Sequence, residues 1–210
     1  MNWTNFISQY RERLIQHTLE HLFLVGISIG IAVILGIPLG ILCTRNSTGK
    51  RIILGLANIF QTIPSLALFG FLIPVPIIGG IGARTAIVAL ILYSFLPIIR
   101  NTYTGIISVD PAIREAGRGM GMTEQQLLFQ VELPLALGFI LAGIRVAAVI
   151  GVGLATIAAA IGAGGLGTFI FAGVGVVNNE LILLGAIPAA LMALVIDLTL
   201  GAIEHRLSSK

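Results

Sequence analysis

Two charged residues, Arg145 and Asp197, lie deep inside otherwise apolar segments of this 210-residue chain. A charge in a hydrocarbon environment faces protein or water, and it pairs with an opposite charge or marks a route for a polar solute. At 1.5 Å per helical residue, Arg145 would lie about 15 Å and Asp197 about 10 Å from the same side of a membrane. An Arg145–Asp197 ion pair and an Arg145 side chain that faces a pore or a subunit interface are therefore both open alternatives.

The second polar feature is the stretch 110–134, where charged residues and glycines interrupt the apolar pattern. Asp110-Pro111 has the composition of a helix start, since Asp accepts bonds from free N–H groups and Pro suits the first turn. Thr123–Gln126 has capping-box spacing and starts a second helix. Gly119 and Gly121 lie between the two helices and allow a sharp reversal, because glycine tolerates positive φ. The stretch therefore predicts a compact helix–turn–helix.

The first helix of this hairpin carries almost no side-chain bulk on one face, which holds Ala112, Ala116 and Gly117. Small residues let another surface approach the backbone closely, and flanking charges can form charge-assisted hydrogen bonds to a partner. A simple linker between two spans needs only a few residues, so a docking element is the favoured interpretation. The candidate docking residues are Arg114, Glu115, Ala116, Gly117, Arg118 and Gly121.

The amino-acid composition indicates which kind of secondary structure positions the polar residues described above. The chain is 57% hydrophobic and 10% charged, whereas soluble domains carry roughly 25% charged residues. Leu22–Cys43 runs for 22 residues without a charge, and about 20 helical residues span a bilayer core. The sequence predicts an all-α integral membrane protein, because backbone groups in hydrocarbon must be bonded within their own segment. The first apolar run is too long for a secretory signal and is interpreted as a retained helix.

Hydropathy predicts about five transmembrane helices, over residues 21–43, 52–73, 83–99, 135–161 and 181–203. The predicted organisation is an N-terminal amphipathic segment (1–20), a transmembrane domain (21–204) and a cytoplasmic tail (205–210). In the first segment, Trp3, Ile7, Tyr10 and Leu14 recur at helical spacing. This pattern suits a helix in the outer membrane interface or one packed on a partner. Three prolines interrupt the second span: Pro64, Pro74 and Pro76. The bends that they cause could line a passage or could be simple packing kinks, and both alternatives are open.

Basic residues predict the orientation, because cytoplasmic loops carry an excess of Lys and Arg. With the hairpin in the cytoplasm, eight of the twelve basic residues fall on that side: Arg45, Lys50, Arg51, Arg100, Arg114, Arg118, Arg206 and Lys210. Three fall on the other side: Arg11, Arg13 and Arg84. The prediction is an N-terminus outside the cell and a C-terminus in the cytoplasm.

The sequence offers no set of residues for catalysis. It lacks the phosphate-binding pattern G-x-x-x-x-G-K-[ST], since Arg51 follows Gly49-Lys50. Gly162–Gly167 matches the dinucleotide pattern G-x-G-x-x-G, but it follows a predicted membrane helix and the first acid, Glu180, comes 13 residues later. These glycines are interpreted as tight turns and close packing. A single cysteine, Cys43, excludes an intrachain disulfide and a cysteine metal cluster, and the dispersed basic residues predict no nucleic-acid partner.

The hairpin resembles the EAA loop of ABC-transporter permeases, in which Glu-Ala-Ala precedes a glycine and then a hydrophobic-x-Leu-Pro sequence. The matching residues are Glu115, Ala116, Gly121, Val131, Leu133 and Pro134. Gly117 replaces the second alanine and Val131 stands where isoleucine is usual. The resemblance implies a coupling helix that sits in a cleft of a separate ATP-binding subunit and transmits its closure to the membrane helices.

Three further segments resemble permeases of osmoprotectant importers: Gln61–Gly70, Leu96–Thr102 and Ala158–Gly167. The resemblance implies the fold of a type I ABC importer permease in a bacterial cytoplasmic membrane, carrying glycine betaine, carnitine, choline or a related quaternary amine. It also implies two ATP-binding subunits that hold ATP and Mg, a second permease (identical or related) and an external substrate-binding protein. This chain itself would be no enzyme and would need no cofactor or metal.

The same resemblance puts an extracellular gate beside the glycine-rich segment, with Phe169 and Phe171 as candidates to close it. Aromatic rings attract quaternary ammonium groups, so Tyr93 is a candidate for brief contact, and Arg145 and Asp197 complete the candidate route. Selectivity is expected mainly in the separate binding protein. The alternatives are an importer for another small amine or amino-acid-like solute, and an ion-coupled transporter, which typically uses intramembrane acids and repeated halves.

Overall fold

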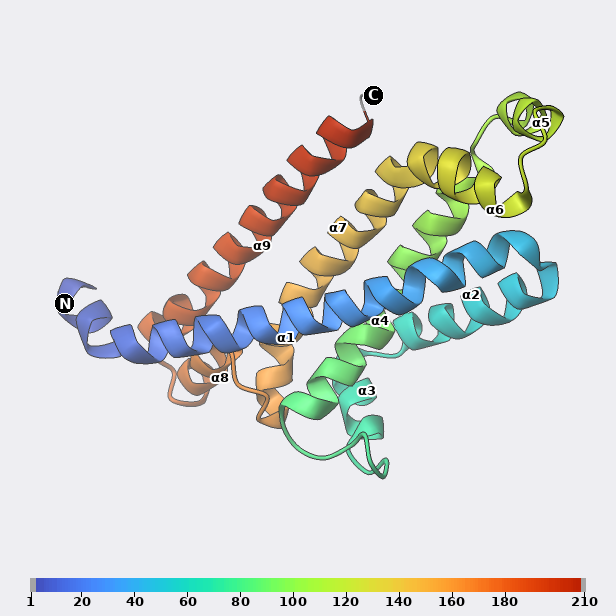
Figure 1. The fold of residues 1–210 in the computed structure, drawn as a ribbon. Helices are drawn as coiled ribbons and strands as arrows, with labels where there is room; N and C mark the ends of the chain where they lie inside the picture. Colours follow the sequence, from blue (N-terminus) through green and yellow to red (C-terminus); the bar gives the residue numbers. More distant parts are fainter. Residues whose placement is uncertain (1–2, 209–210) are drawn as a thin grey trace.

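The structure is a computed structural model that describes residues 3–208, with side chains described for residues 8–207. In this part the chain forms helices and connecting loops without β-strands. Four long helices pack side by side: α1 (Trp3–Arg45), α4 (Ala83–Ile107), α7 (Leu133–Ala158) and α9 (Asn179–Ser208) (Figure 1). Each is long and apolar enough to cross a membrane, which agrees with the predicted all-α membrane fold.

The predicted second span is broken into α2 (Ser47–Thr62) and α3 (Ser65–Leu72), which meet at an angle of 106°. Pro64 causes the break, because a proline disfavours helical geometry in the residue before it, and Ile63 is extended with ψ 128°. The hydroxyl of Tyr93 on α4 donates a hydrogen bond to the carbonyl of Ile63. The bend is therefore held by the neighbouring helix.

Helices α1 and α4 run in the same direction, which decides that α2–α3 is a complete span. Ser28 on α1 donates to the carbonyl of Ile87 at 3.4 Å, and further along Gly36 lies against Ile98 and Gly40 against Thr102. Two parallel helices must be joined by a segment that returns across the bundle. The prediction of five spans is therefore confirmed.

Glycines let the central helices approach closely. A methyl group on Gly40 of α1 would lie 2.6 Å from Cβ of Thr102 on α4, and one on Gly143 of α7 would lie 2.7 Å from Cβ of Asn101. Membrane helices gain little from the hydrophobic effect and depend on such close contact. Helix α9 packs mainly on α7 and leaves an apolar face exposed, with Leu191, Leu194, Val195 and Leu198.

Helix α1 is much longer than a bilayer core. Its 43 residues extend for about 65 Å at 1.5 Å per residue, against a core of about 30 Å. The predicted boundary between residues 20 and 21 is not a break in the helix. The side chains of Trp3 and Ile7 lie outside the described ones, as do residues 1–2, 209 and Lys210. An interfacial position for this segment stays a prediction.

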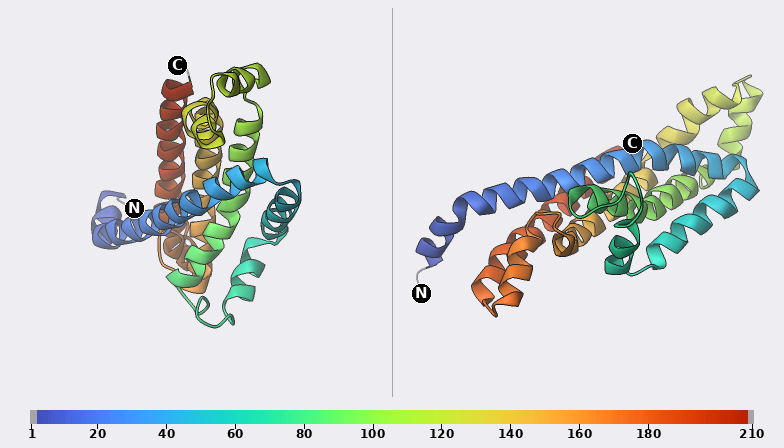
Figure 2. Two further views of the ribbon diagram at one scale, coloured as in Figure 1. Left: turned by 45° about the vertical axis from the view of Figure 1, so that its right-hand side comes forward. Right: turned by 90° about the horizontal axis from the view of Figure 1, so that it is seen from below.

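The bundle has two distinct ends (Figures 1 and 2). At one end lie α8 (Gly167–Gly175) and the first part of α1; we call it the α8 end. At the other end, α5 (Pro111–Gly119) and α6 (Glu124–Leu127) form the predicted hairpin; we call it the hairpin end. Arg45, at the end of α1, reaches this hairpin.

Candidate functional site

The hairpin begins and turns largely as its sequence predicts. The Asp110 carboxylate accepts a hydrogen bond from the N–H of Ala112 at 2.8 Å and so caps α5. Thr123 and Gln126 form the capping box that starts α6. The reversal uses Gly121, whose φ is +82°, whereas Gly119 is the last residue of α5 and has no positive φ. Only one of the two glycines is therefore required by the turn.

The small-residue face of α5 divides into an outer and an inner part. Ala112, Glu115 and Ala116 are exposed. Gly117 is buried instead: a methyl group there would lie 2.8 Å from Cδ1 of Leu127 and 3.2 Å from Sδ of Met122. Its predicted place on the docking face is corrected, because it provides the contact between the two arms of the hairpin. A glycine in place of the usual second alanine leaves room for Leu127, which is fully buried.

Arg114 and Arg118, predicted to bond to a partner, form ion pairs within the chain. Nε of Arg114 lies 3.2 Å from Oε1 of Glu132, and its guanidinium also donates to the carbonyl of Ile106. Nε of Arg118 donates to Oε1 of Glu124 at 3.1 Å. This hydrogen bond lowers the pKa of the exposed Glu124 carboxyl, because it favours the charged form. Arg114 is half-buried by these contacts, whereas Arg118 stays exposed, and a bond from either arginine to a partner stays a prediction.

Arg45 connects the two carboxylates of this network, which we call the hairpin charge network (Arg45, Arg114, Arg118, Glu124 and Glu132). Its Nη2 donates to Oε2 of Glu132 at 2.8 Å and its Nη1 to Oε2 of Glu124 at 3.1 Å. The side chain of Glu132 is 3% exposed, whereas that of Glu124 is 61% exposed. Glu115 makes no ion pair or side-chain hydrogen bond within the described residues.

The sequence reasoning missed Arg45, Glu124 and Glu132. Arg45 was used only as one of the basic residues that predict the orientation in the membrane. Its partners lie 79 and 87 residues away along the chain. One local signal was present, since Glu132 is an acid between two apolar residues, Val131 and Leu133. A carboxylate in such a setting needs a cationic partner.

A π-helical turn, Leu128–Glu132, joins α6 to α7. The N–H of Leu133 bonds to the carbonyl of Leu128, five residues back. Pro134 explains the wide turn, because its ring would clash with a carbonyl four residues earlier in an α-helix. The fourth span was predicted to begin at residue 135, but helical structure is continuous from Glu124 to Ile161.

Arg145 and Asp197 form an ion pair between α7 and α9. Nε and Nη2 of Arg145 donate to the two carboxylate oxygens of Asp197 at 2.6 and 2.8 Å. Nη1 lies 3.4 Å from Oε2 of Glu204. Gly201 leaves space for the guanidinium, since a methyl group there would lie 2.9 Å from Nη1. Of the two alternatives from the sequence, the structure has the ion pair.

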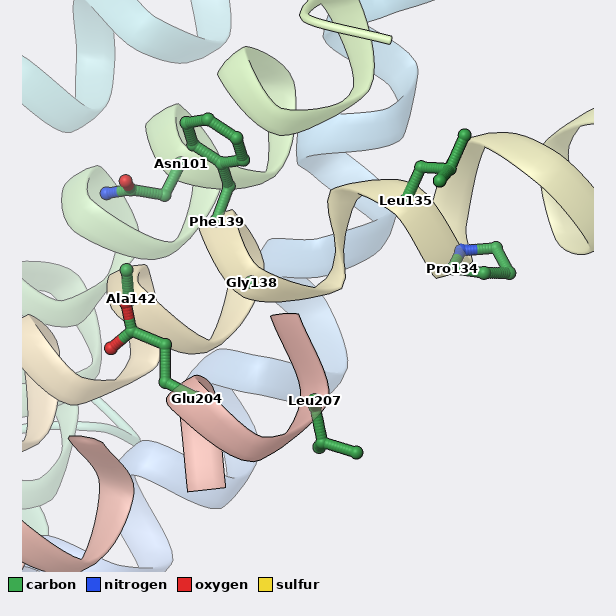
Figure 3. Close-up of a pocket in the computed structure, with 8 residues that line it drawn as sticks. All are labelled: Asn101, Pro134, Leu135, Gly138, Phe139, Ala142, Glu204 and Leu207. Atoms are coloured by element: carbon green, nitrogen blue, oxygen red, sulfur yellow. The ribbon is translucent and has the colours of Figure 1, made fainter. Parts of the chain in front are cut away.

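This ion pair borders an open groove, which we call the α7–α9 groove. One part of about 350 Å³ is lined by Arg145, Asp197 and Glu204. A second part of about 570 Å³ shares Glu204 and reaches Asn101 on α4. Figure 3 shows Glu204 projecting from α9 toward α7, with Asn101 and Phe139 on the opposite side. The groove combines an apolar wall with a few charged and polar groups.

The aromatic candidates occupy different positions from those predicted. Tyr93 is 7% exposed and holds the α2–α3 bend. Phe169 is 5% exposed, and its ring lies edge to face with Tyr10 and His17 of α1, with ring centroids 6.1 and 5.0 Å away. Both side chains therefore serve packing within the chain. Phe171 is 43% exposed and is the phenylalanine of the predicted gate that still faces outward.

The glycine-rich segment before α8 is a tight loop held by α1. Gly162, Gly164 and Gly165 have φ of +73°, +81° and +77°, a region that favours glycine. Oε2 of Glu20 accepts from the N–H of Gly165 at 3.0 Å. This geometry agrees with the interpretation of these glycines as turn and packing residues.

Buried His21 fastens the same loop from its other side. Its Nδ1 lies 3.3 Å from the N–H of Leu166, and its Nε2 lies 3.1 Å from the carbonyl of Val152. An N–H group can only donate and a carbonyl can only accept, so the proton is assigned to Nε2 and the imidazole is neutral. Both ring nitrogens are satisfied, as a fully buried polar side chain requires.

Comparison with known proteins identifies the family. The model described as "Binding-protein-dependent transport system inner membrane component" matches residues 36–209. The chain belongs to this family. The carnitine transport permease protein OpuCB of Listeria monocytogenes is 45% identical, over 98% of this chain and 93% of that protein. The osmoprotectant import permease protein OsmW of Salmonella typhimurium is 46% identical, over 92% of this chain and 91% of that protein.

Solved structures give the same fold. The chain matches the MetNI methionine ABC transporter in an inward-facing form with a TM-score of 0.84 and 24% identity, over 95% of this chain and 98% of that one. This confirms the predicted fold of a type I ABC importer permease. The permease is thus a multi-pass membrane subunit of a transporter and not an enzyme. The family description makes it the inner membrane component of a transport system that depends on a binding protein.

Proposed function

We propose that this permease is the membrane subunit of an ATP-driven importer for osmoprotectants, namely glycine betaine, carnitine, choline or a related quaternary amine. The observation that carries the proposal is identity along almost the whole chain to permeases named for these solutes. The glycine betaine/carnitine/choline permease OpuCD of Bacillus subtilis, for example, is 46% identical over 97% of this chain. The TM-score to a methionine transporter supports the fold alone, so it does not favour an amino acid as the solute.

Uptake into liposomes tests this proposal. The permease is reconstituted with its ATPase and binding protein, and labelled glycine betaine, carnitine and choline are supplied in turn. We expect uptake with ATP and without an ion gradient, for at least one of the three. Uptake driven by an ion gradient alone would instead support the ion-coupled alternative, and uptake restricted to an amino acid would support the other one.

The second part of the proposal concerns assembly and orientation. Two permeases, identical or related, pair in the membrane, and each hairpin lies in a cleft of one of two ATP-binding subunits that hold ATP and Mg. The hairpin and the C-terminus then face the cytoplasm, with the N-terminus outside. Support comes from the exposed surface of α5: Ala112 and Ala116 leave the backbone accessible, and Glu115 is exposed without an ion pair in the described part of the chain.

Charge reversal tests the docking surface. Glu115→Arg should abolish co-purification of the ATPase while the permease still inserts, since a charge-assisted contact would become repulsive. Glu12→Arg is the matched control, because Glu12 is also exposed and lies on the part of α1 near the α8 end. Gly117 is unsuitable for this test, because a large side chain there would displace Leu127 and unfold the hairpin. Equal co-purification of both variants would contradict the docking role.

The third part of the proposal assigns the route to the α7–α9 groove, with Arg145 and Asp197 on its wall and Phe171 nearer the outer gate. Arg145→Asp and Asp197→Arg should each abolish uptake, because like charges would then face each other at the distance of the present pair. The double exchange should restore uptake, since it rebuilds the pair in reverse. No recovery in the double variant would mean that the pair itself is not what transport requires.

A further inference from the structure

We propose that Arg45 and Glu132 are positioning residues that fasten the coupling hairpin to α1 and to the start of α7. The hairpin and these helices then move as one body when the ATPase closes. This inference rests on the proposed coupling role of the hairpin. It assigns a role to two residues outside the predicted docking surface, one at the end of α1 and one in the π-helical turn.

The buried carboxylate of Glu132 is the centre of the attachment. Arg45 approaches it from α1 at 2.8 Å and Arg114 from α5 at 3.2 Å. A buried carboxylate without any cationic partner is an uncompensated charge, which is strongly destabilising, so Glu132 holds both arginines close to it. Three elements are therefore tied to one side chain that has no access to water as a substitute partner.

Arg45 is suited to this position because of its shape. One nitrogen of its guanidinium bonds to Glu132 and another to Glu124, so the planar group spans a buried and an exposed carboxylate at once. A lysine ammonium is a compact charge on a flexible stem and does not offer this fixed fork. The bond to buried Glu132 is the one that holds the hairpin, whereas the bond to exposed Glu124 contributes little.

The attachment adds a third support to the hairpin. The chain itself connects the hairpin to α4 and, through the π-helical turn, to α7. Within residues 8–207, every ion pair and side-chain hydrogen bond between α1 and the hairpin comes from Arg45. Arg114 also bonds to the carbonyl of Ile106 on α4, so Arg45 adds the polar contact with α1 to those with α4 and α7. Without Arg45, we expect pressure on α5 to move α1 less than it moves α4 and α7.

The ratio of solute taken up to ATP hydrolysed measures this coupling. Arg45→Gln and Glu132→Gln are made in the complete complex with ATPase and binding protein, in liposomes with labelled glycine betaine, carnitine or choline, whichever the wild type carries. We expect the ATPase to co-purify and hydrolysis to stay within about twofold of wild type. Uptake per ATP should fall at least about tenfold, equivalent to about 1.4 kcal/mol of lost coupling.

Three further variants separate positioning from general damage. Glu124→Gln is the matched control, since it removes the exposed partner of the same arginine and exposed pairs contribute little; its ratio should change less than about twofold. Arg45→Lys keeps the charge without the fork and should give an intermediate ratio. The double variant Arg45→Gln with Glu132→Gln should be no worse than the worse single variant, because both substitutions remove the same contact.

The possible outcomes are distinct. A wild-type complex without ATP-driven uptake of these solutes would overturn the proposed function. A wild-type ratio in Arg45→Gln, in a complex that assembles, would overturn only the positioning role. Loss of ATPase binding in Arg45→Gln would overturn it as well, since Arg45 would then act in assembly. Arg45 is 36% exposed, so this variant decides the matter even where Glu132→Gln does not fold.

Discussion

The two ends of α1 hold their neighbours by different chemistry. At the hairpin end, Arg45 makes ion pairs with Glu124 and Glu132. At the α8 end, Glu20 and the neutral imidazole of His21 accept hydrogen bonds from backbone N–H groups of the glycine loop. The difference teaches that one helix can be attached through ion pairs between side chains at one end and through hydrogen bonds to backbone at the other. The exposed ion pair between Arg118 and Glu124 is screened by salt, whereas the hydrogen bond from Leu166 to the buried, neutral His21 is not.

The α8 end should be the more sensitive to a change in shape. Gly167→Ala should lower the free energy of unfolding by about 3 kcal/mol, because its methyl group would run into the carbonyl of Thr156. Gly153→Ala is the matched control, since no atom lies within 4 Å of a methyl group there, and it should be neutral or stabilising by up to about 1 kcal/mol. Thermal unfolding in detergent measures both, and equal melting temperatures would contradict the packing seen at Gly167.

Removal of the buried imidazole should have the next largest effect. His21→Ala leaves the N–H of Leu166 without its acceptor, and such a group costs about 1–3 kcal/mol. His205→Ala makes the same change at an exposed position near the end of α9 and should leave the melting temperature unchanged. If the two variants have the same melting temperature, the hydrogen bonds of His21 do not stabilise the glycine loop.

Salt should separate the two ends. A rise in NaCl from about 0.1 to 1 M shortens the screening length from about 10 to 3 Å. It should speed hydrogen exchange at the amides of α5 and α6, whose ion pair between Arg118 and Glu124 is exposed. Exchange at Leu166 should not change, because its acceptor is the neutral and fully buried imidazole of His21. Equal acceleration at both ends would remove the distinction between them.

The smallest effect should come from pH at the hairpin end. The hydrogen bond from Arg118 lowers the pKa of Glu124 below its ordinary value of 4.5. A lowered pKa means that the contribution to stability is present above 4.5 and is lost as pH falls through the lower value. Melting temperature should therefore show no step from Glu124 between pH 8 and 5. Below pH 4.5, the melting temperature of the wild type should fall by a small amount because this contribution is lost. The melting temperature of Glu124→Gln should not show this additional fall.

Much of the fold could be predicted because its signals are local. The uncharged run Leu22–Cys43 identified a span, and Thr123–Gln126 identified the start of α6. The bend at Pro64 was also visible, although its cause in the passage or in packing was not. The Arg145–Asp197 pair was one of two alternatives, since two opposite charges at similar depth suggest contact without establishing it.

The residues of the candidate site were harder to assign. Gly117 was placed on the docking face by helical spacing, but the position of Leu127 turns it inward. Phe169 was placed at a gate, but the length of α1 brings Tyr10 and His17 over its ring. Each correction depends on a second element whose path the local pattern does not describe.

The sequence by itself determined the number of spans, the capped helices and the reversal at Gly121, because each follows from hydrophobicity or backbone preference within a few residues. Only the tertiary structure decided that Arg45 meets Glu132 and that Glu20 and His21 hold the glycine loop, across separations of 87, 145 and 145 residues. The physical reason is that an ion pair or a buried hydrogen bond requires atoms within about 3 Å, and packing of whole helices brings such distant residues together.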